Sequence, residues 1–301
     1  SDVLLNGGKS DSYAIVPDYY NGILPKVVAK VGEKVKAGSV LMIDKNRPEI
    51  KFVSPVSGEV TAVNRGEKRK VLSIVVKPDA QIEYEEFGKK NVASLQGAEV
   101  KEVLLNAGMW PFIKQRPYDI VAAPLDTPRD IFVSAFYSAP LAPNFDFIVK
   151  GQEADFQTGL NALAKLTNGK VYVGVRSGSV VSGMKGVEIV EVEGPHPAAN
   201  VGVQINHIKP VNKGEVVWTV NPADVIVIGR LFNKGVADFS RMVAITGSET
   251  TERGYVKTIS GCTIKSLVNG KVLGQEHIRI ISGNVLTGTK VNMDGYLGAY
   301  D

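Results

Sequence analysis

Two short stretches decide the fold of the amino-terminal part of this chain: VGEKVKAGSVL at residues 31–41 and SPVSGEV at residues 54–60. Each stretch predicts a strand, a tight turn and a second strand. Gly32, Gly38 and Gly58 supply the positive φ that such turns require. The valines and leucines between them have the β-branched and aliphatic side chains that fill a small flattened barrel. We therefore predict two similar halves that together close one β-barrel.

The pattern resembles the biotinyl/lipoyl carrier domains, in which the modified lysine lies on the hairpin between the halves. Lys45 follows Ile43-Asp44 here much as a carrier lysine would. However, Asn46-Arg47-Pro48 comes next, and the return to Ser54 is about two residues longer than in lipoyl domains. Because one added residue turns side chains to the opposite face, we expect a barrel kept as a scaffold, with Lys45 in solvent. A swinging-arm function of Lys45 is the alternative.

Length and composition limit the number of domains, the class of protein and the kinds of partner that are expected. A chain of 301 residues is too long for one small core, so two or three domains are expected. With 44% hydrophobic and 22% charged residues, the chain belongs with ordinary soluble globular proteins. A formal net charge of +4 is only mildly basic, and no basic stripe with interleaved aromatic residues accompanies it. Nucleic acid is therefore not expected as a partner.

Basic residues gather on two predicted turns of the barrel. A solvated face is one interpretation of these residues, and contact with an anionic membrane or an acidic partner protein is the other. The clusters are Lys26, Lys30, Lys34 and Lys36, and then Arg65, Lys68, Arg69 and Lys70.

Cys262 is the only cysteine, which excludes a disulfide within the chain and a cysteine-ligated iron–sulfur cluster. We expect it to be a small buried apolar residue in a reducing, cytoplasmic setting. His196, His207 and His277 lack metal-ligand spacing, so no metal site is predicted. No apolar run approaches the ~18 to 20 residues of a spanning helix, and we expect membrane contact only through partner subunits. The chain starts without methionine, so we expect a piece truncated at both ends.

We predict an α+β multidomain fold in four segments: a barrel at 1–95, a connector helix within 96–118, a Rossmann-like α/β domain at 119–237 and a β-grasp module at 238–301. Apolar residues at Val100, Val103, Leu104 and Ala107 recur with helical spacing in the connector. Short apolar runs around an amphipathic helix near Leu160 are typical of a parallel α/β sheet. The predicted strands are Asp119–Ala123, Ile131–Ala135, Asp146–Val149, Lys170–Val175 and Val187–Val192. In the last segment they are Met242–Ile245, Tyr255–Ile259 and His277–Ile281, with a helix at Thr263–Val268.

The default ligand site of such a sheet is the crevice at the carboxyl ends of its strands. The loop Arg176–Gly186 follows one of these strands and contains several glycines and serines. It lacks the G-x-G-x-x-G pattern and leads into a strand, whereas nucleotide phosphates need glycine turns at a helix N-terminus. Phosphate binding is therefore only weakly indicated.

Two stretches are hard to explain as generic α/β sequence: GPHPAANVG at residues 194–202 and ISGNVLTGT at residues 281–289. Four short motifs accompany them, and together they make the chain similar to the NqrA subunits of the sodium-translocating NADH:quinone oxidoreductases, along nearly its whole length. More distantly it resembles the RnfC subunits of the Rnf electron-transport complexes and the flavin-carrying NADH-oxidising subunit of respiratory complex I. The short motifs are Asn64-Arg65-Gly66, Gly108-Met109-Trp110, Arg116-Pro117 and Leu297-Gly298.

The resemblance implies a peripheral subunit on the cytoplasmic face of the bacterial inner membrane. It implies a six-subunit complex that carries electrons from NADH to quinone while exporting Na⁺. In that family FMN, FAD, riboflavin and a 2Fe-2S centre belong to other subunits, and this one holds no tightly bound redox centre. Quinone would bind it transiently, and the isolated chain is expected to be inactive. The family pattern also extends beyond both ends of this chain.

Quinone recognition needs an apolar cleft and one or two donors for the carbonyl oxygens. His196 and Pro197 are our quinone candidates, because prolines on both sides stiffen the loop that presents the imidazole. The alternative is that His196 caps a helix at Ala198–Ile208, with His207 packing on that helix. No catalytic residue is predicted. Two other functions stay open: a purely structural docking module, and an FMN- and NADH-binding oxidoreductase subunit, which would need a phosphate loop that we do not find.

Overall fold

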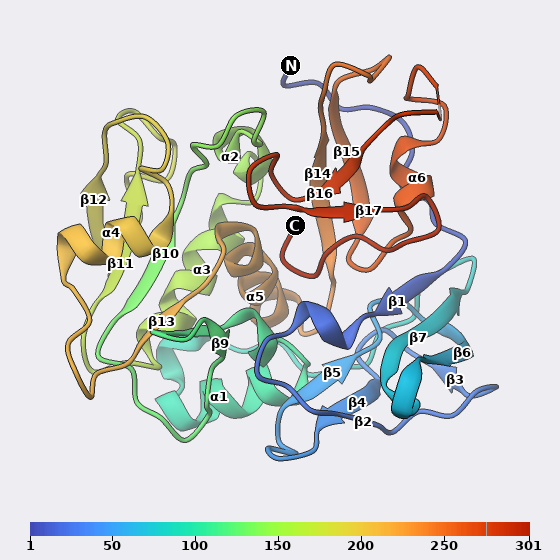
Figure 1. Cartoon of the computed structure of the whole chain (residues 1–301). Helices are drawn as coiled ribbons and strands as arrows, with labels where there is room; N and C mark the ends of the chain where they lie inside the picture. Colours follow the sequence, from blue (N-terminus) through green and yellow to red (C-terminus); the bar gives the residue numbers. More distant parts are fainter. Residues whose placement is uncertain (275) are drawn as a thin grey trace.

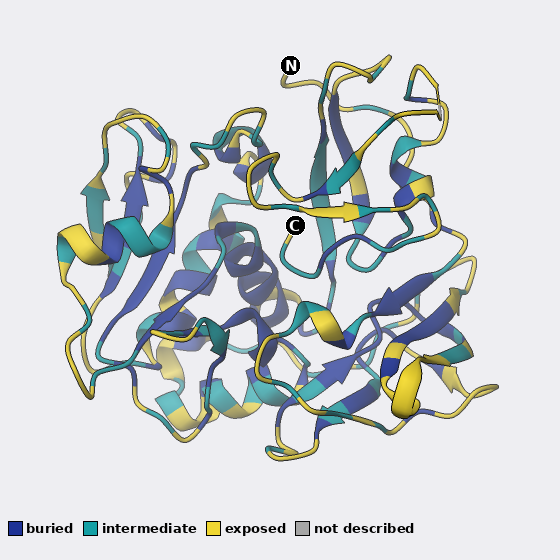
Figure 2. Cartoon of the chain, in the orientation of Figure 1, coloured by how far each residue is buried: buried dark blue, intermediate teal, exposed yellow. Residues whose placement is uncertain are grey.

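The computed structural model describes residues 1–274 and 276–301. Figure 1 shows a small β-barrel at the lower right, an α/β sheet at the left and a third module at the upper right. Helix α5 (Pro222–Lys234) lies in the middle, and nearly all of its residues are buried (Figure 2). The three modules therefore share one continuous core and are not merely joined by flexible linkers.

The barrel consists of two antiparallel sheets packed face to face. The first sheet has the strand order β1-β7-β6-β3, and the second has the order β2-β4-β5. Two 3₁₀ turns, η1 (Pro17–Tyr19) and η2 (Glu67–Arg69), lie between strands. The strands are β1 (Tyr13–Ile15), β2 (Pro25–Val27), β3 (Lys34–Val35), β4 (Val40–Asp44), β5 (Lys51–Val53), β6 (Gly58–Arg65) and β7 (Val71–Pro78).

The glycine turns that predict this barrel have the expected backbone conformation. Gly32, Gly38 and Gly58 have φ of +92°, +105° and +156°. At Gly58 the need for glycine is also steric, because a Cβ there would overlap the carbonyl oxygen of Lys77 on the paired strand. The predicted barrel-sandwich hybrid is confirmed, since its turns occur where the glycines require them.

The hairpin that carries Lys45 is fastened to the neighbouring domain. Lys45 is exposed, while Asp44 beside it is buried and accepts a 3.0 Å bond from Arg47 Nε. The guanidinium of Arg47 also donates to the carbonyl oxygens of Val121 and Gly22, both at 3.4 Å. This docking supports the scaffold interpretation of the hairpin.

After the barrel, the chain forms η3 (Val92–Ser94), α1 (Gly97–Asn106) and η4 (Trp110–Phe112). The predicted connector helix is confirmed, with Val100 and Leu104 on its buried side. Trp110 is fully buried, donates from Nε1 to the carbonyl oxygen of Ala122 at 2.8 Å, and meets Trp218 edge to face. It packs the connector onto the next domain.

The α/β domain contains a six-stranded sheet of order β12-β11-β10-β13-β8-β9. Its first four strands are parallel, and β8 and β9 add an antiparallel edge. β8 lies within the expected connector segment and pairs with β13, so that segment also contributes to this sheet. The strands are β8 (Lys114–Arg116), β9 (Ile120–Val121), β10 (Ile131–Ser134), β11 (Val171–Val175), β12 (Glu188–Glu191) and β13 (Val217–Thr219).

Helices cover both faces of this sheet, as the Rossmann-like prediction requires. Phe132 packs with Ile205 of α4 on one face, whereas Val133 and Val173 belong to the large core on the opposite face with α3 and α5. The additional helices are α2 (Phe145–Val149), α3 (Glu153–Ala164) and α4 (Val201–Ile208).

The strand that we predicted at Asp146–Val149 is wrong, because these residues form helix α2. The side chain of Asn144 caps the helix by accepting from the backbone N of Asp146 at 3.1 Å. Phe145, Ile148 and Val149 are buried, and their spacing places them on one side of a helical turn. The predicted helix at Ala198–Ile208 also starts later, at Val201.

The third module consists of two hairpins and one short helix. The amino-terminal arm crosses to it, because Leu5 N donates to Tyr255 O at 2.7 Å and Tyr255 N donates to Val3 O at 2.8 Å. The strand predicted from His277 begins only at Ile280, since His277 has a φ of +64°, which a strand does not allow. The elements are β14 (Ser240–Ile245), β15 (Gly254–Ile259), α6 (Ile264–Val268), β16 (Ile280–Ser282) and β17 (Thr289–Val291).

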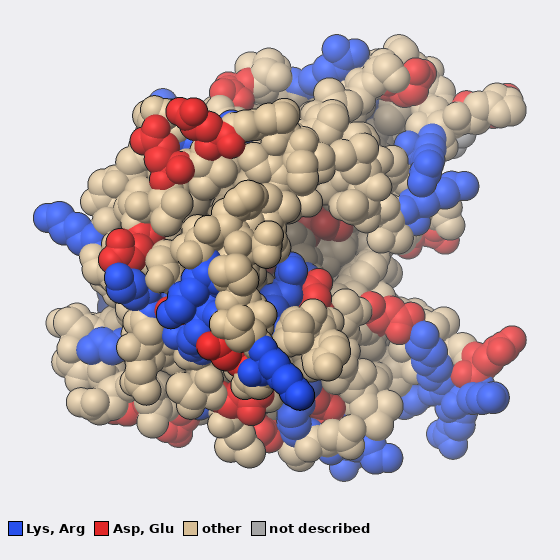
Figure 3. Space-filling model, turned by 60° about the vertical axis from the view of Figure 1, so that its left-hand side comes forward, with Lys and Arg blue, Asp and Glu red and all other residues tan. Residues whose placement is uncertain are grey.

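Two further predictions concern single features. Cys262 is fully buried, as expected, and burial raises the pKa of its thiol. Among residues 1–274 and 276–301, no helix combines the length and the apolar character needed to cross a bilayer. Acidic and basic side chains are scattered over the face shown in Figure 3, where a hollow separates the upper and lower parts.

Candidate functional site

The predicted quinone residues lie on the loop that follows β12. His196 is half-buried and Pro197 is exposed. The imidazole Nδ1 of His196 is 3.0 Å from Ser138 Oγ, and this hydroxyl also accepts from the backbone N of Ala199 at 3.0 Å. His196 therefore does not cap helix α4, which begins at Val201 after Asn200. Its ring is held by the segment that follows β10.

The carboxyl ends of β10 and β11 are filled by the protein's own side chains. Gln204 of α4 is buried and donates to Ser134 Oγ at 3.0 Å and to Ala198 O at 3.1 Å. Ser134 Oγ in turn donates to Ala199 O at 2.6 Å. A Cβ on Gly174 would overlap the amide of Gln204, so that amide lies directly against β11. The Gln204 side chain therefore occupies this part of the crevice.

A doubly wound sheet usually binds its ligand at the switch point, where successive connections leave in opposite directions. In this sheet the switch point lies between β10 and β13, because the chain runs from β10 to β11 and β12 on one side and later returns to β13 on the other. Helix α5 begins just beyond β13, at Pro222. A phosphate in such a site would normally face the N-terminus of this helix.

A buried ion pair occupies this end of the helix. Asp224 lies in the first turn of α5 and is fully buried. Arg241 of β14 donates from Nη2 to Asp224 Oδ1 at 2.8 Å, and Asn221 Nδ2 donates to the carbonyl oxygen of Tyr300 at 3.2 Å. A carboxylate and the third module thus occupy the place where an anion would bind.

Burial shifts the protonation of Asp224. Loss of water raises the pKa of this carboxyl group, and the Arg241 guanidinium opposes the rise. Its second oxygen, Oδ2, is buried without a hydrogen-bond partner in the described part of the chain. The ion pair is therefore a costly contact that joins α5 to the third module.

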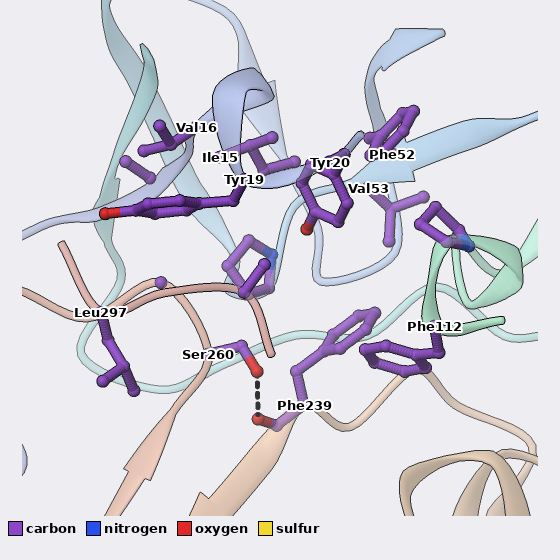
Figure 4. A pocket seen from close by; sticks show the side chains of 16 residues that line it. Ile15, Val16, Tyr19, Tyr20, Phe52, Val53, Phe112, Phe239, Ser260 and Leu297 are labelled. Atoms are coloured by element: carbon purple, nitrogen blue, oxygen red, sulfur yellow. Dashed lines mark hydrogen bonds between the residues drawn. The ribbon is translucent and has the colours of Figure 1, made fainter. Parts of the chain in front are cut away.

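A separate hollow lies where the three modules meet (Figure 4). Its interior space is about 50 Å³, and the volume reaches about 550 Å³ only when the open solvent at its mouth is included. Its walls are mostly aliphatic and aromatic, and none of its lining residues is Asp, Glu, Lys, Arg or His. The barrel contributes Ala14, Ile15, Val16, Tyr19, Tyr20, Phe52, Val53 and Pro55; the connector contributes Gly108, Pro111 and Phe112; the third module contributes Phe239, Ser260, Gly261, Leu297 and Ala299.

Tyr20 provides the free donor of this hollow. Its ring is fixed edge to face by Phe52, at 4.8 Å between ring centroids, and by Tyr300, at 5.7 Å. Its hydroxyl points toward Phe239 in Figure 4 and makes no hydrogen bond within residues 1–274 and 276–301. By contrast, the hydroxyl of Tyr19 donates to the carbonyl oxygen of Tyr296 at 2.9 Å.

Burial raises the pKa of Tyr20, and the nearby Asp224 carboxylate raises it further. The phenol therefore stays protonated and remains a hydrogen-bond donor at every physiological pH. Sequence analysis missed this residue, because a tyrosine after a short strand has no motif around it.

Comparison with known proteins identifies the family of this chain. Three family models match the chain: the NqrA N-terminal barrel-sandwich hybrid domain over residues 1–79, the NqrA second alpha/beta domain over 95–237 and the NQRA C-terminal domain over 242–293. The NqrA-type subunit of the Na(+)-translocating NADH-quinone reductase from Neisseria meningitidis serogroup A is 35% identical over 99% of this chain and 68% of its own length. The chain belongs to this family.

A second relative, the same subunit of this reductase from Yersinia pseudotuberculosis, is 36% identical over 95% of this chain and 65% of its own length. The chain thus spans about two thirds of the length of these curated relatives. A solved structure described as an NAD⁺-reducing nickel–iron hydrogenase in the H2-reduced state has a TM-score of 0.42 and 12% identity, over 58% of this chain and 40% of that chain.

Family membership confirms the resemblance and the fold class that the sequence indicated. The assignment of His196 and Pro197 to quinone stays a prediction, and so do our domain boundaries. In the described parts of the chain, no group of three or more His, Cys, Asp or Glu residues is placed to hold a metal ion.

Proposed function

We propose that this chain is the peripheral NqrA subunit of a six-subunit Na⁺-translocating NADH:quinone reductase. In this proposal it lies on the cytoplasmic face of the bacterial inner membrane and contributes quinone binding and assembly contacts. The membrane is reached only through partner subunits. Electrons pass from NADH to quinone through FMN, FAD, riboflavin and a 2Fe-2S centre in those partners, and this chain holds no redox centre. The names of its relatives support this role.

The observation that carries the proposal is a contrast between two places in the molecule. At the switch point, where an α/β domain would take a nucleotide, Asp224 and Arg241 form a buried ion pair. At the module junction an apolar hollow offers the hydroxyl of Tyr20, which has no hydrogen-bond partner in the described residues. A quinone needs an apolar surface and one or two donors, whereas a flavin nucleotide also needs a phosphate site. The contrast therefore favours quinone over FMN.

His196 and Pro197 provide a second possible contact for quinone. The Nδ1 of His196 is already bonded to Ser138, so only the other ring nitrogen would be left for a quinone carbonyl. A histidine near neutral pH also has the chemistry to donate a proton to a reduced quinone. The exposed Pro197 would then form an apolar side of this contact.

Thermal stability with and without ligands tests the proposal. Ubiquinone-1 at about 100 times its dissociation constant should add about 2.7 kcal/mol to the free energy of unfolding. FMN and NADH should add nothing, the purified chain should be colourless, and it should not oxidise NADH. If no quinone raises the melting temperature, the chain is instead a docking module. If FMN raises it and colours the protein yellow, the chain is a flavin-binding subunit.

A further inference from the structure

We propose that the quinone ring binds in the hollow at the module junction and that the Tyr20 hydroxyl donates a hydrogen bond to one of its carbonyl oxygens. This inference rests on the proposed function and gives the quinone a definite site. The proposed site lies far from the His196 loop in sequence.

The chemistry of the walls selects the class of ligand. The rings of Phe52, Phe112 and Phe239 face the hollow, each from a different module (Figure 4). Aromatic walls favour a flat ring that can stack or meet them edge to face. Because no lining residue is Asp, Glu, Lys, Arg or His, a charged nucleotide would lose its hydration without compensation. An uncharged planar ring avoids that cost.

The polar atoms of the hollow leave one donor free. Ser260 Oγ is already engaged, since it donates to Phe239 O at 3.3 Å and accepts from Arg241 Nε at 2.8 Å. The hydroxyl of Tyr19 is also engaged. Only the Tyr20 hydroxyl among these groups lacks a partner in the described residues. Its ring is fixed by two edge-to-face contacts, so little conformational freedom would be lost when it binds an acceptor.

The position of the hollow implies that quinone binding depends on the assembled chain. Its walls come from the barrel, the connector and the third module, and Tyr300 closes the side next to Tyr20. No single module contains a complete site. The intact chain is therefore the proper object for a binding experiment.

Isothermal titration of the intact chain with ubiquinone-1 tests the site. Tyr20→Phe keeps the ring and removes only the hydroxyl, so we expect about tenfold weaker binding. Ala299→Leu should narrow the hollow and weaken binding by at least as much. Tyr172→Phe is the matched control, because Tyr172 is a half-buried tyrosine stacked on Phe132 of the sheet, outside the hollow. It should bind like the parent chain. His196→Ala is titrated beside it, because the His196 loop is the other candidate contact for quinone.

Each other outcome has a definite meaning. If Tyr20→Phe and Ala299→Leu fold normally by circular dichroism and bind within twofold of the parent, the junction site is wrong. If His196→Ala alone weakens binding, the quinone lies at the His196 loop, and the proposed function survives without this inference. If the parent chain binds no ubiquinone-1, both the proposed function and the site fail.

Discussion

The carboxyl edge of the α/β sheet and the junction of the three modules differ in how they are filled. At the sheet edge, Gln204 closes the ends of β10 and β11, and Arg241 meets Asp224 at the switch point. At the junction, walls from separate modules leave a hollow in which the Tyr20 hydroxyl has no partner among the residues that the structure describes. The fold class predicts a ligand at the first place, and the observed packing favours the second. A shared fold thus says little about where a ligand binds.

The two places differ in the partners that their side chains meet. At the sheet edge Gln204 bonds to Ser134, and at the switch point Asp224 pairs with Arg241 of the third module. At the junction the rings of Tyr20 and Phe52 meet edge to face, and a hollow remains beside them. Ser260 links the two places, because its Oγ lines the hollow and accepts from Arg241.

The largest expected effect comes from removing the cation at the switch point. Arg241→Met should destabilise the chain by about 3–5 kcal/mol, because it leaves the fully buried Asp224 carboxylate without its partner. Urea unfolding measures the change. Arg279→Met, which removes an exposed arginine of the same module, should stay within about 0.5 kcal/mol. Equal losses in both variants would mean that the ion pair does not close the crevice.

The pH dependence of Arg241→Met sharpens this prediction. Burial raises the pKa of Asp224 above its ordinary value, and loss of the guanidinium should raise it further. The folded variant then binds a proton more readily than the unfolded chain, so its stability falls as pH rises through the raised pKa. Its deficit relative to the parent should therefore be smaller near pH 4 than near pH 8. If the loss of stability does not change with pH, the Asp224 carboxylate is exposed to solvent.

A smaller effect is expected where Gln204 closes the sheet. Gly174→Ala should cost about 1–3 kcal/mol, because the new methyl group overlaps the buried amide. In a Gln204→Ala background the same change should cost almost nothing. Gly183→Ala is the control, since a Cβ there meets nothing within 4 Å. Unfolding midpoints of the four proteins measure the coupling, and an additive result would contradict the close fit between α4 and β11.

The smallest effect should come from the His196 loop. Ser138→Ala removes an oxygen that contacts His196 Nδ1 and accepts from the backbone N of Ala199. We expect a loss of about 1 kcal/mol, with unchanged binding of ubiquinone-1. Denaturant unfolding and titration of the same sample give both values. Weaker quinone binding without a change in stability would favour the loop as the binding site.

Much of the fold could be predicted from local patterns. The positive φ of Gly32, Gly38 and Gly58 follows directly from their turns, and the spacing of Val100 and Leu104 indicates α1. The parallel strand β13 was not predicted, but the other three, β10, β11 and β12, were recognisable as short apolar runs. Their bounds in the structure differ by only a few residues from those predicted.

The failures have local physical causes. A run of four or five apolar residues fits a strand or one helical turn equally well, and at α2 the cap from Asn144 decides for the helix. At His277 the backbone takes a left-handed conformation that no residue pattern announced. The strand β8 became visible only when its partner β13 was placed beside it.

The hollow could not be predicted because its walls are distant in sequence. Tyr20, Phe112 and Phe239 lie in three separate segments, and none stands in a motif. The ion pair at α5 was equally hidden, since Asp224 meets an arginine of another module. Such sites depend on how modules are placed together, and single-sequence patterns do not carry that information.

The amino-terminal arm also has a consequence for how the molecule is made. Ser10 Oγ lies 3.0 Å from Thr263 Oγ1, 253 positions later in the chain, and Leu5 pairs with Tyr255. The residues of the arm leave the ribosome long before their partners, so they wait unpaired until the third module has been synthesised. Contacts of such long range slow folding, because the loop that they close is large. The arm is thus made early and docks late, and its docking joins the two ends of the structure described above.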